Sequence, residues 1–165
     1  MPATLYLLRH GKVNKDEDHD ALAPAGTEFR DWLPSFFQER GVRLATVFYD
    51  AGDGVKRCAA TLVKVDCETR TAYGPGPGKK YKTLNAVLAD IKEGRHALCC
   101  RGDSIESGQL YHVQDFELHT PFSCGNHGKE ASDHMKNSYH AIYVLELMDG
   151  VWRQTDRIPM PAQHS

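Results

Sequence analysis

Cationic side chains follow three of the strands that the sequence predicts. The first strand ends in an arginine and a histidine, the loop and helical turn after the second carry a lysine and an arginine, and the fourth ends in an arginine. In parallel α/β sheets, ligands bind where the carboxyl ends of the strands meet. We therefore expect one imidazole and two or three guanidinium groups to share one crevice. These residues are Arg9, His10, Lys56, Arg57 and Arg101.

The combination suits the transfer of a phosphoryl group. Arginine presents a fixed fork of N–H donors that matches phosphate oxygens, and a neutral imidazole can attack phosphorus as a nucleophile. Positive charge beside His10 lowers the pKa of its imidazole and keeps it neutral near pH 7. We expect the phosphoryl group to pass to His10 while the arginines neutralise its charge. Because we place His10 at a surface-like strand end, we expect its replacement by alanine to leave the fold intact.

Short apolar runs alternate with amphipathic stretches, which predicts an α/β fold of three layers, α/β/α, around a mostly parallel sheet. One helix should begin at Pro24 and stop at Gly41, with a kink or break at Pro34. A turn at 148–150 should let 151–158 pair back as an antiparallel edge strand. The predicted strands are 4–8, 45–49, 71–73, 97–100 and 139–147, and further helices follow Val55 and Leu84, the latter closed by Gly94.

The connections between these elements differ in character. Residues 12–20 are charged and are predicted to form a loop, and the helix after the second strand should place Leu62 and Val63 on one apolar side. Residues 106–136 are polar, rich in His and Gly, and without clear period. We predict a short helix there, followed by a long irregular excursion over the sheet.

The composition bounds the class of protein. The length of 165 residues fits a single domain spanning 1–165. With 20 Lys and Arg against 22 Asp and Glu, the net charge is −2, which argues against a nucleic-acid binder held by a general basic field. No apolar run is long enough to cross a bilayer and no secretory signal is visible, so a cytoplasmic location is expected.

The cysteines and histidines do not form a recognisable metal pattern. Five cysteines without CxxC spacing argue against a disulfide framework or a zinc ribbon. Cys99 and Cys100 fall in a predicted strand and should be small buried apolar residues. Cys124, His127 and His134 have the spacing Cys-x2-His-x6-His, which lacks a fourth ligand. We therefore predict no metal site.

The residues around His10 resemble the signature of the histidine phosphatase superfamily, also called the phosphoglycerate-mutase-like family. Residues 7–13 (LLRHGKV) are similar to its L-x-R-H-G-x-[TSA], residues 22–26 (LAPAG) to its L-[TS]-x-x-G, and residues 57–61 (RCAAT) to its R-A-x-Q-T. The chain size, short middle region and terminal strand pair most resemble the small bacterial phosphohistidine phosphatases. The resemblance extends over residues 4–158.

The resemblance implies a set of roles. His10 matches the phosphorylated nucleophile of the family, and Arg9 and Arg57 match its phosphate-clamping arginines. The family passes the phosphoryl group to this histidine and then to water, with neither a metal nor an organic cofactor. The implied partner is a phosphorylated small molecule or a phosphoprotein. Lys56 and Arg101 join the substrate-binding candidates through their positions at strand ends.

Three departures from the family pattern stand beside this resemblance. Where the family has a second histidine in V-V-x-H-G, residues 98–102 read LCCRG. Arg101 therefore occupies the place of that histidine, and it can bind phosphate but cannot shuttle a proton near neutral pH. The usual S-S-P-L is replaced by DAGDG at 50–54, which brings negative charge near the predicted anion site. The family's acid has no clear counterpart, and Asp103 and Glu106 are positional candidates for substrate contact.

Three functions stay open on the sequence: a phosphatase, a non-catalytic relative that binds a phosphorylated or anionic ligand, and an enzyme that uses the same pocket for other chemistry. Retention of the signature favours the first, and loss of the second histidine favours the second. Arg57 can also be interpreted as a solvated helix residue, and Arg101 as the ion-pair partner of Asp53 or Asp103. With a permanent cation at position 101, we expect weak or absent turnover.

Overall fold

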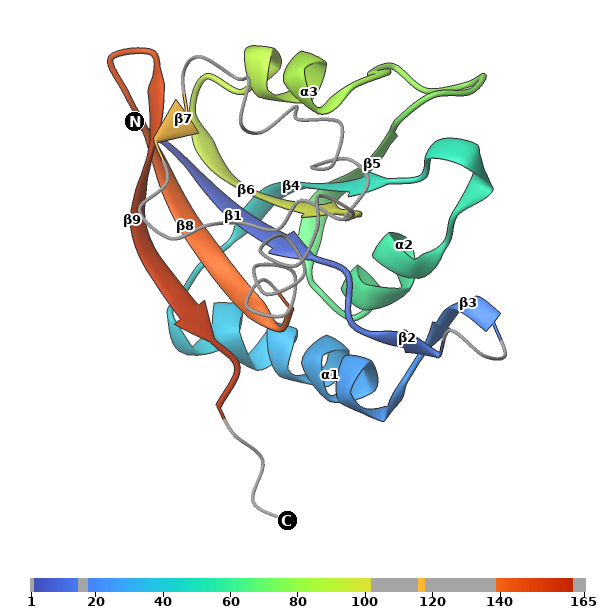
Figure 1. The fold of residues 1–165 in the computed structure, drawn as a ribbon. Helices are drawn as coiled ribbons and strands as arrows, with labels where there is room; N and C mark the ends of the chain where they lie inside the picture. The colour runs from blue at the N-terminus through green and yellow to red at the C-terminus, as the bar shows by residue number, and fades with distance from the viewer. Residues whose placement is uncertain (1, 15–17, 102–115, 118–138, 162–165) are drawn as a thin grey trace.

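The computed structural model describes residues 2–14, 18–101, 116–117 and 139–161, which build a seven-stranded sheet and a separate two-stranded hairpin (Figure 1). The strand order in the sheet is β5-β4-β6-β1-β8-β9-β7, and the hairpin is β2-β3. The strands are β1 (Ala3–Arg9), β2 (Val13–Asn14), β3 (Asp18–Leu22), β4 (Leu44–Asp50), β5 (Cys67–Tyr73), β6 (Gly94–Cys100), β7 (Phe116–Glu117), β8 (Ala141–Met148) and β9 (Val151–Pro159). The helices are α1 (Pro24–Glu39), α2 (Arg57–Leu62) and α3 (Leu84–Asp90), with a 3₁₀ turn at Gly52–Gly54.

Strand β1 lies at the centre of the sheet, and all but one of its side chains are buried. It pairs in parallel with β6 and antiparallel with β8. The register sets Arg9 beside Cys100, so the residues after β1 and β6 emerge together. Strand β4 pairs in parallel with β6 on its other side. The three strands whose ends carry the predicted site residues are therefore neighbours.

Helices cover both faces of the sheet, with α1 and α2 on one face and α3 on the other (Figure 1). The apolar residues of each helix recur at helical spacing and point into the core beneath it. This confirms the predicted three-layer α/β/α fold with a mostly parallel sheet. On α1 the buried apolar residues are Phe29, Leu33, Phe36 and Phe37, and on α3 they are Leu84, Val87 and Leu88.

Three predicted details of the sheet are wrong. Strand β9 pairs antiparallel with β8 as expected, but it is not the edge, because β7 pairs with it in parallel. Strand β5 begins at Cys67 rather than at residue 71. The exposed polar residues in its first half give no strand pattern in the sequence, and it is their pairing with β4 that makes them a strand. Gly94 opens β6 instead of closing the preceding helix.

The helices also differ from expectation at three points. Helix α1 is not split at Pro34, because apolar residues on both sides of the proline bury against the same core. Helix α2 ends at Leu62, which leaves the Val63 side chain 60% exposed rather than packed. The predicted loop at 12–20 contains the hairpin strands β2 and β3.

The predicted excursion at 106–136 lies outside the described residues, apart from β7. Cys124, His127 and His134 lie outside them as well. Cys99 and Cys100 are fully buried, as predicted. None of the described helices is long and apolar enough to cross a membrane.

Candidate functional site

His10 follows β1 directly and is held by the sheet. Its backbone N–H donates to the carbonyl of Cys100 at 3.2 Å, and the side chain is only 4% exposed. The imidazole Nδ1 lies 2.8 Å from the carbonyl oxygen of Gly11. A carbonyl oxygen only accepts, so Nδ1 carries the proton and donates. In the neutral ring the lone pair then sits on Nε2, the nitrogen available for nucleophilic attack.

The imidazole of His10 is held in its neutral form. Burial lowers its pKa to about 3, and the positive fields of Arg9, Arg57 and Arg101 act in the same direction, against the opposing hydrogen bond to Gly11. The sequence predicts the direction from neighbouring charge, but burial is the larger cause. The expectation that His10 is surface-like is wrong, because the residue lies between the sheet and the loop that follows it.

Two glycines let the loop after His10 pack closely against the start of α1. A Cβ on Gly11 would lie 2.9 Å from the Cα of Gly26, and a Cβ on Gly26 would collide with the backbone of Lys12. The backbone N–H of Gly11 donates to the hydroxyl of Thr61 at 2.9 Å, and that hydroxyl donates to the carbonyl of Arg57 at 2.8 Å. The close packing therefore leaves no room for a side chain at Gly11 or Gly26. The hydrogen bonds of Thr61 connect α2 to the loop after His10.

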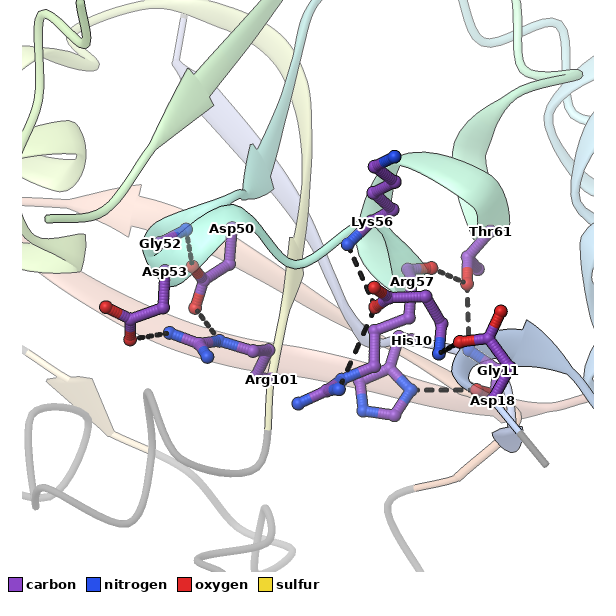
Figure 2. Close-up of polar contacts among 11 residues, drawn as sticks. His10, Gly11, Asp18, Asp50, Gly52, Asp53, Lys56, Arg57, Thr61 and Arg101 are labelled. Carbon is purple, nitrogen blue, oxygen red and sulfur yellow. Dashed lines mark hydrogen bonds and ion pairs between the residues drawn. The ribbon is translucent and has the colours of Figure 1, made fainter. Parts of the chain in front are cut away.

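Arg57 is the first residue of α2, and Figure 2 shows its guanidinium beside the imidazole of His10. Asp20 of β3 approaches this guanidinium, with Oδ1 3.9 Å from Nη1. The same Asp20 oxygen accepts the backbone N–H of Lys56 at 3.0 Å. Lys56 contributes its backbone here, while its exposed side chain points away from His10 (Figure 2).

Arg101 follows β6 and is held by the loop after β4. Its Nε donates to Oδ2 of Asp50 at 3.0 Å, and Nη2 lies 3.7 Å from Oδ2 of Asp53. Asp50 also accepts the backbone N–H of Gly52 at 2.9 Å. A Cβ on Gly52 would lie 2.6 Å from Cδ of Pro75 and 3.1 Å from Nη2 of Arg101, so glycine makes room for both side chains. Figure 2 shows the guanidinium turned toward the two carboxylates and away from His10.

Arg9 contacts an aromatic ring. Its guanidinium carbon lies 3.9 Å from the ring centroid of Tyr139, and the arginine side chain is 4% exposed. The same ring meets the imidazole of His10 edge to face, with centroids 6.0 Å apart. The neighbouring His140 accepts the backbone N–H of Lys12 on Nε2 at 3.1 Å.

Of the predicted site residues, the structure brings Arg9, His10 and Arg57 together. Arg101 is a neighbour held by carboxylates, and Lys56 turns its side chain away. Asp103 and Glu106 lie outside the described residues. Sequence reasoning missed Asp20 and Tyr139, because each lies on a different element from the arginine that it approaches. Asp50 and Thr61 lie in segments that the sequence singled out, but their contacts with Arg101 and with the Gly11 backbone were not predicted.

Comparison with known proteins rests on structure alone. No protein-family profile matches the sequence and no curated protein matches it. Among solved structures, the candidate phosphohistidine phosphatase SixA from Agrobacterium tumefaciens superposes with a TM-score of 0.60 at 17% identity, covering 98% of this chain and 99% of that one. The chain has the SixA fold. The candidate SixA from Nakamurella multipartitia agrees, with a TM-score of 0.58 at 14% identity, covering 99% of this chain and 96% of that one.

The neighbours in structure share the fold that the motif resemblance implies. At these identities the superposition shows the fold, and the chemistry of this chain has to be argued from its own residues.

Proposed function

We propose that the chain is a phosphatase that hydrolyses a phosphate monoester or phosphohistidine through a phosphohistidine intermediate at His10. The observation that carries the proposal is the state of that imidazole. It is neutral, it is oriented by a hydrogen bond from Nδ1, and Arg9 and Arg57 lie beside it. The proposal treats residues 1–165 as one domain and takes as substrate a phosphorylated small molecule or phosphoprotein of the cytoplasm.

The reaction has two displacement steps at phosphorus. In the first, the lone pair of His10 Nε2 forms a bond to phosphorus while the bond to the leaving oxygen or nitrogen breaks, and the leaving atom takes up a proton from solvent water. In the second, water attacks phosphorus, the N–P bond breaks and its electron pair returns to Nε2, and inorganic phosphate leaves. Arg9 and Arg57 stabilise the negative charge on the transferring group in both steps. The resemblance implies that neither step requires a metal or an organic cofactor.

The test compares His10→Ala with a matched control, His96→Ala. His96 lies on β6 beside Leu5, toward the opposite end of the sheet, where its Nε2 contacts the carbonyl of Glu93 at 2.8 Å. Hydrolysis of an aryl phosphate and of a phosphohistidine peptide should disappear in the first variant and persist in the second. Phosphorus NMR of protein quenched in alkali should show a phosphohistidine signal in the wild type. Equal hydrolysis by wild type and His10→Ala contradicts the proposal.

A second candidate function is binding of a phosphorylated ligand without turnover, which the position of Arg101 favours. Arginine stays protonated near neutral pH and cannot supply the proton that the leaving group needs. General acid–base help contributes about 100-fold to 10,000-fold, so its loss leaves a binding site with little catalysis. The Arg101→His variant distinguishes the two functions. A rise in turnover supports the second, and robust wild-type hydrolysis that falls in this variant supports the first.

A further inference from the structure

The peptide group between Gly11 and Lys12 makes a hydrogen bond to a histidine at each of its ends. Its carbonyl oxygen, on Gly11, accepts the Nδ1–H of His10 at 2.8 Å (Figure 2). Its N–H, on Lys12, donates to Nε2 of His140 at 3.1 Å. The peptide bond is trans, so its N–H and C=O point in opposite directions. The two imidazoles are therefore connected through a single amide.

The backbone N–H of Lys12 fixes the tautomer of His140. An amide N–H only donates, so Nε2 of His140 carries a lone pair and the proton of the neutral ring sits on Nδ1. Burial and the neighbouring Lys12 ammonium lower the pKa of His140 to about 4, so this ring is neutral near pH 7. Both histidines thus carry their proton on Nδ1, and His10 donates to the amide while His140 accepts from it.

The amide after Gly11 depends on its partners for its orientation, because glycine restricts its own backbone less than any other residue. The N–H of Gly11 donates to the hydroxyl of Thr61, and the carbonyl of Lys12 accepts the N–H of Ala23. Both of these bonds belong to the neighbouring peptide groups. The bond to His140 is made by the same amide that orients His10.

The position of His140 is fixed by its backbone and by packing. It has a positive φ of 56°, a conformation that is uncommon outside glycine. Its carbonyl accepts the N–H of Met160 at 2.8 Å, and its ring packs against Phe29 with centroids 5.1 Å apart. A strained backbone persists where its surroundings over-determine it, and this one directs Nε2 to the loop after His10.

We propose that His140 is a positioning residue for His10 and acts on it through the Gly11–Lys12 amide. An amide whose N–H is donated to an acceptor has a stronger acceptor in its carbonyl, since hydrogen bonds in a chain polarise one another. His140 thereby keeps the proton of His10 on Nδ1 and the lone pair on Nε2. This role rests on the proposed function only in taking that lone pair as the nucleophile.

The experiment compares variants of the full chain at position 140. Nitrogen-15 NMR at pH 7 shows which ring nitrogen of His10 carries the proton, with His10→Ala used to assign the signals. His140→Phe keeps a ring beside Phe29 but has no acceptor, and His140→Asn suits the positive φ but is too short to reach the amide. Both should move the His10 proton partly to Nε2. His140→Gln places an acceptor oxygen near the position of Nε2 and should restore the wild-type spectrum.

Hydrolysis of an aryl phosphate gives the second readout. In His140→Phe and His140→Asn, kcat should fall about tenfold to a hundredfold, because misplacing a reacting group by about 1 Å can cost this much. KM should stay within about twofold of the wild type, since the change affects the chemical step. His96→Phe is the matched control and should change neither readout. The His96 ring also lies near a phenylalanine, Phe48, and its Nε2 contacts a backbone carbonyl, but it lies toward the opposite end of the sheet.

An unchanged His10 tautomer in both His140→Phe and His140→Asn overturns the proposal. A His140→Gln variant that behaves like His140→Phe overturns it as well, because the acceptor is then not the active group. If neither His140→Phe nor His140→Asn folds, the wild type decides. A scalar coupling between the amide nitrogen of Lys12 and Nε2 of His140 supports the proposal, and its absence overturns it.

Failure of this role and failure of the proposed function give different results. If the wild type hydrolyses no ester but the His10 proton still moves when the acceptor is lost, the role of His140 stands and the phosphatase assignment falls. If hydrolysis depends on His10 but neither kcat nor the NMR spectrum responds to changes at position 140, the assignment stands and the role falls.

Discussion

Arg9 and Arg101 stand at the ends of adjacent parallel strands, yet the side chains beside them differ in kind. The guanidinium carbon of Arg9 lies 3.9 Å from the ring centroid of Tyr139, whereas Arg101 lies near the carboxylates of Asp50 and Asp53. The two carboxylates offset the positive charge of Arg101, which an uncharged ring cannot do. Counting arginines in a sequence therefore overstates the positive field of a site, because the partner of each decides how much charge reaches the ligand.

The ion pair between Arg101 and Asp50 is buried and is therefore costly to break. The side chains of Arg101 and Asp50 are 11% and 4% exposed, and breaking a buried ion pair leaves a charge without compensation. Two departures from the motif pattern that the sequence resembles also meet here, because Arg101 and the acidic loop at 50–54 contact each other.

We expect the largest change in stability from removing the carboxylate charge beside Arg101. Asp50→Asn removes the charge opposite Arg101, and the free energy of unfolding should fall by about 3 kcal/mol, the usual cost of an uncompensated buried charge. Urea unfolding at pH 7 measures it. An unchanged midpoint would show that the pair contributes nothing and that the two arginines differ less than their partners suggest.

Lowering the pH should destabilise the protein through the region around Arg9, because His10 and His140 are held neutral there. Burial lowers the pKa of His10 to about 3 and that of His140 to about 4, in the second case with help from Lys12. Both values lie below the unfolded value near 6.5, so their stability contribution is complete above that pH and is lost as pH falls. Each group lowers the free energy of unfolding by up to about 1.4 kcal/mol per pH unit.

Urea unfolding at pH 7, 6 and 5 measures this slope. His10→Ala should reduce the slope, since it removes one of the two groups. A free energy of unfolding that is flat between pH 7 and pH 5 would contradict the assignment of both histidines as neutral.

Phosphate binding should separate the two arginines directly. The proposed function has Arg9 bind the ligand, so in Arg9→Gln the affinity for inorganic phosphate should fall about tenfold to a hundredfold. Arg101→Gln removes a cation already paired with carboxylates, and the loss should be smaller. Calorimetric titration of both variants gives the ratio. A greater loss for Arg101 would mean that phosphate draws it away from Asp50.

The smallest effect is expected at the exposed end of the Arg101 pair. The Asp53 side chain is 76% exposed and lies 3.7 Å from Nη2, where solvent screens the interaction. Asp53→Asn should change the free energy of unfolding by about 0.5 kcal/mol or less. Asparagine also tolerates the positive φ of 59° at this position, so a large loss would reveal a role beyond the ion pair.

Local patterns were enough to predict the centre of the fold and much less of the site. The apolar run of β1 predicts a strand, and the Arg9-His10-Gly11 tripeptide that follows it predicts an imidazole at the end of that strand. Both patterns can be recognised because they lie within ten residues of each other. The sequence also allows Asp53 as a partner of Arg101, and that contact is present. Asp50 is the closer partner, and only the alignment of β4 beside β6 shows it. Tyr139 was missed because no local pattern links it to Arg9.

The hydrogen bond from Lys12 to His140 joins groups 128 residues apart in the chain. A nascent polypeptide emerging from the ribosome exposes the residues of β1 early, but β1 pairs with β6 and β8, and Lys12 contacts His140, so this part of the structure must wait for residues far along the chain. Contacts of such long sequence separation slow folding, because the intervening chain must be ordered first. A truncation that removes β8 and β9 should therefore yield a fragment that presents the signature motif without a working pocket.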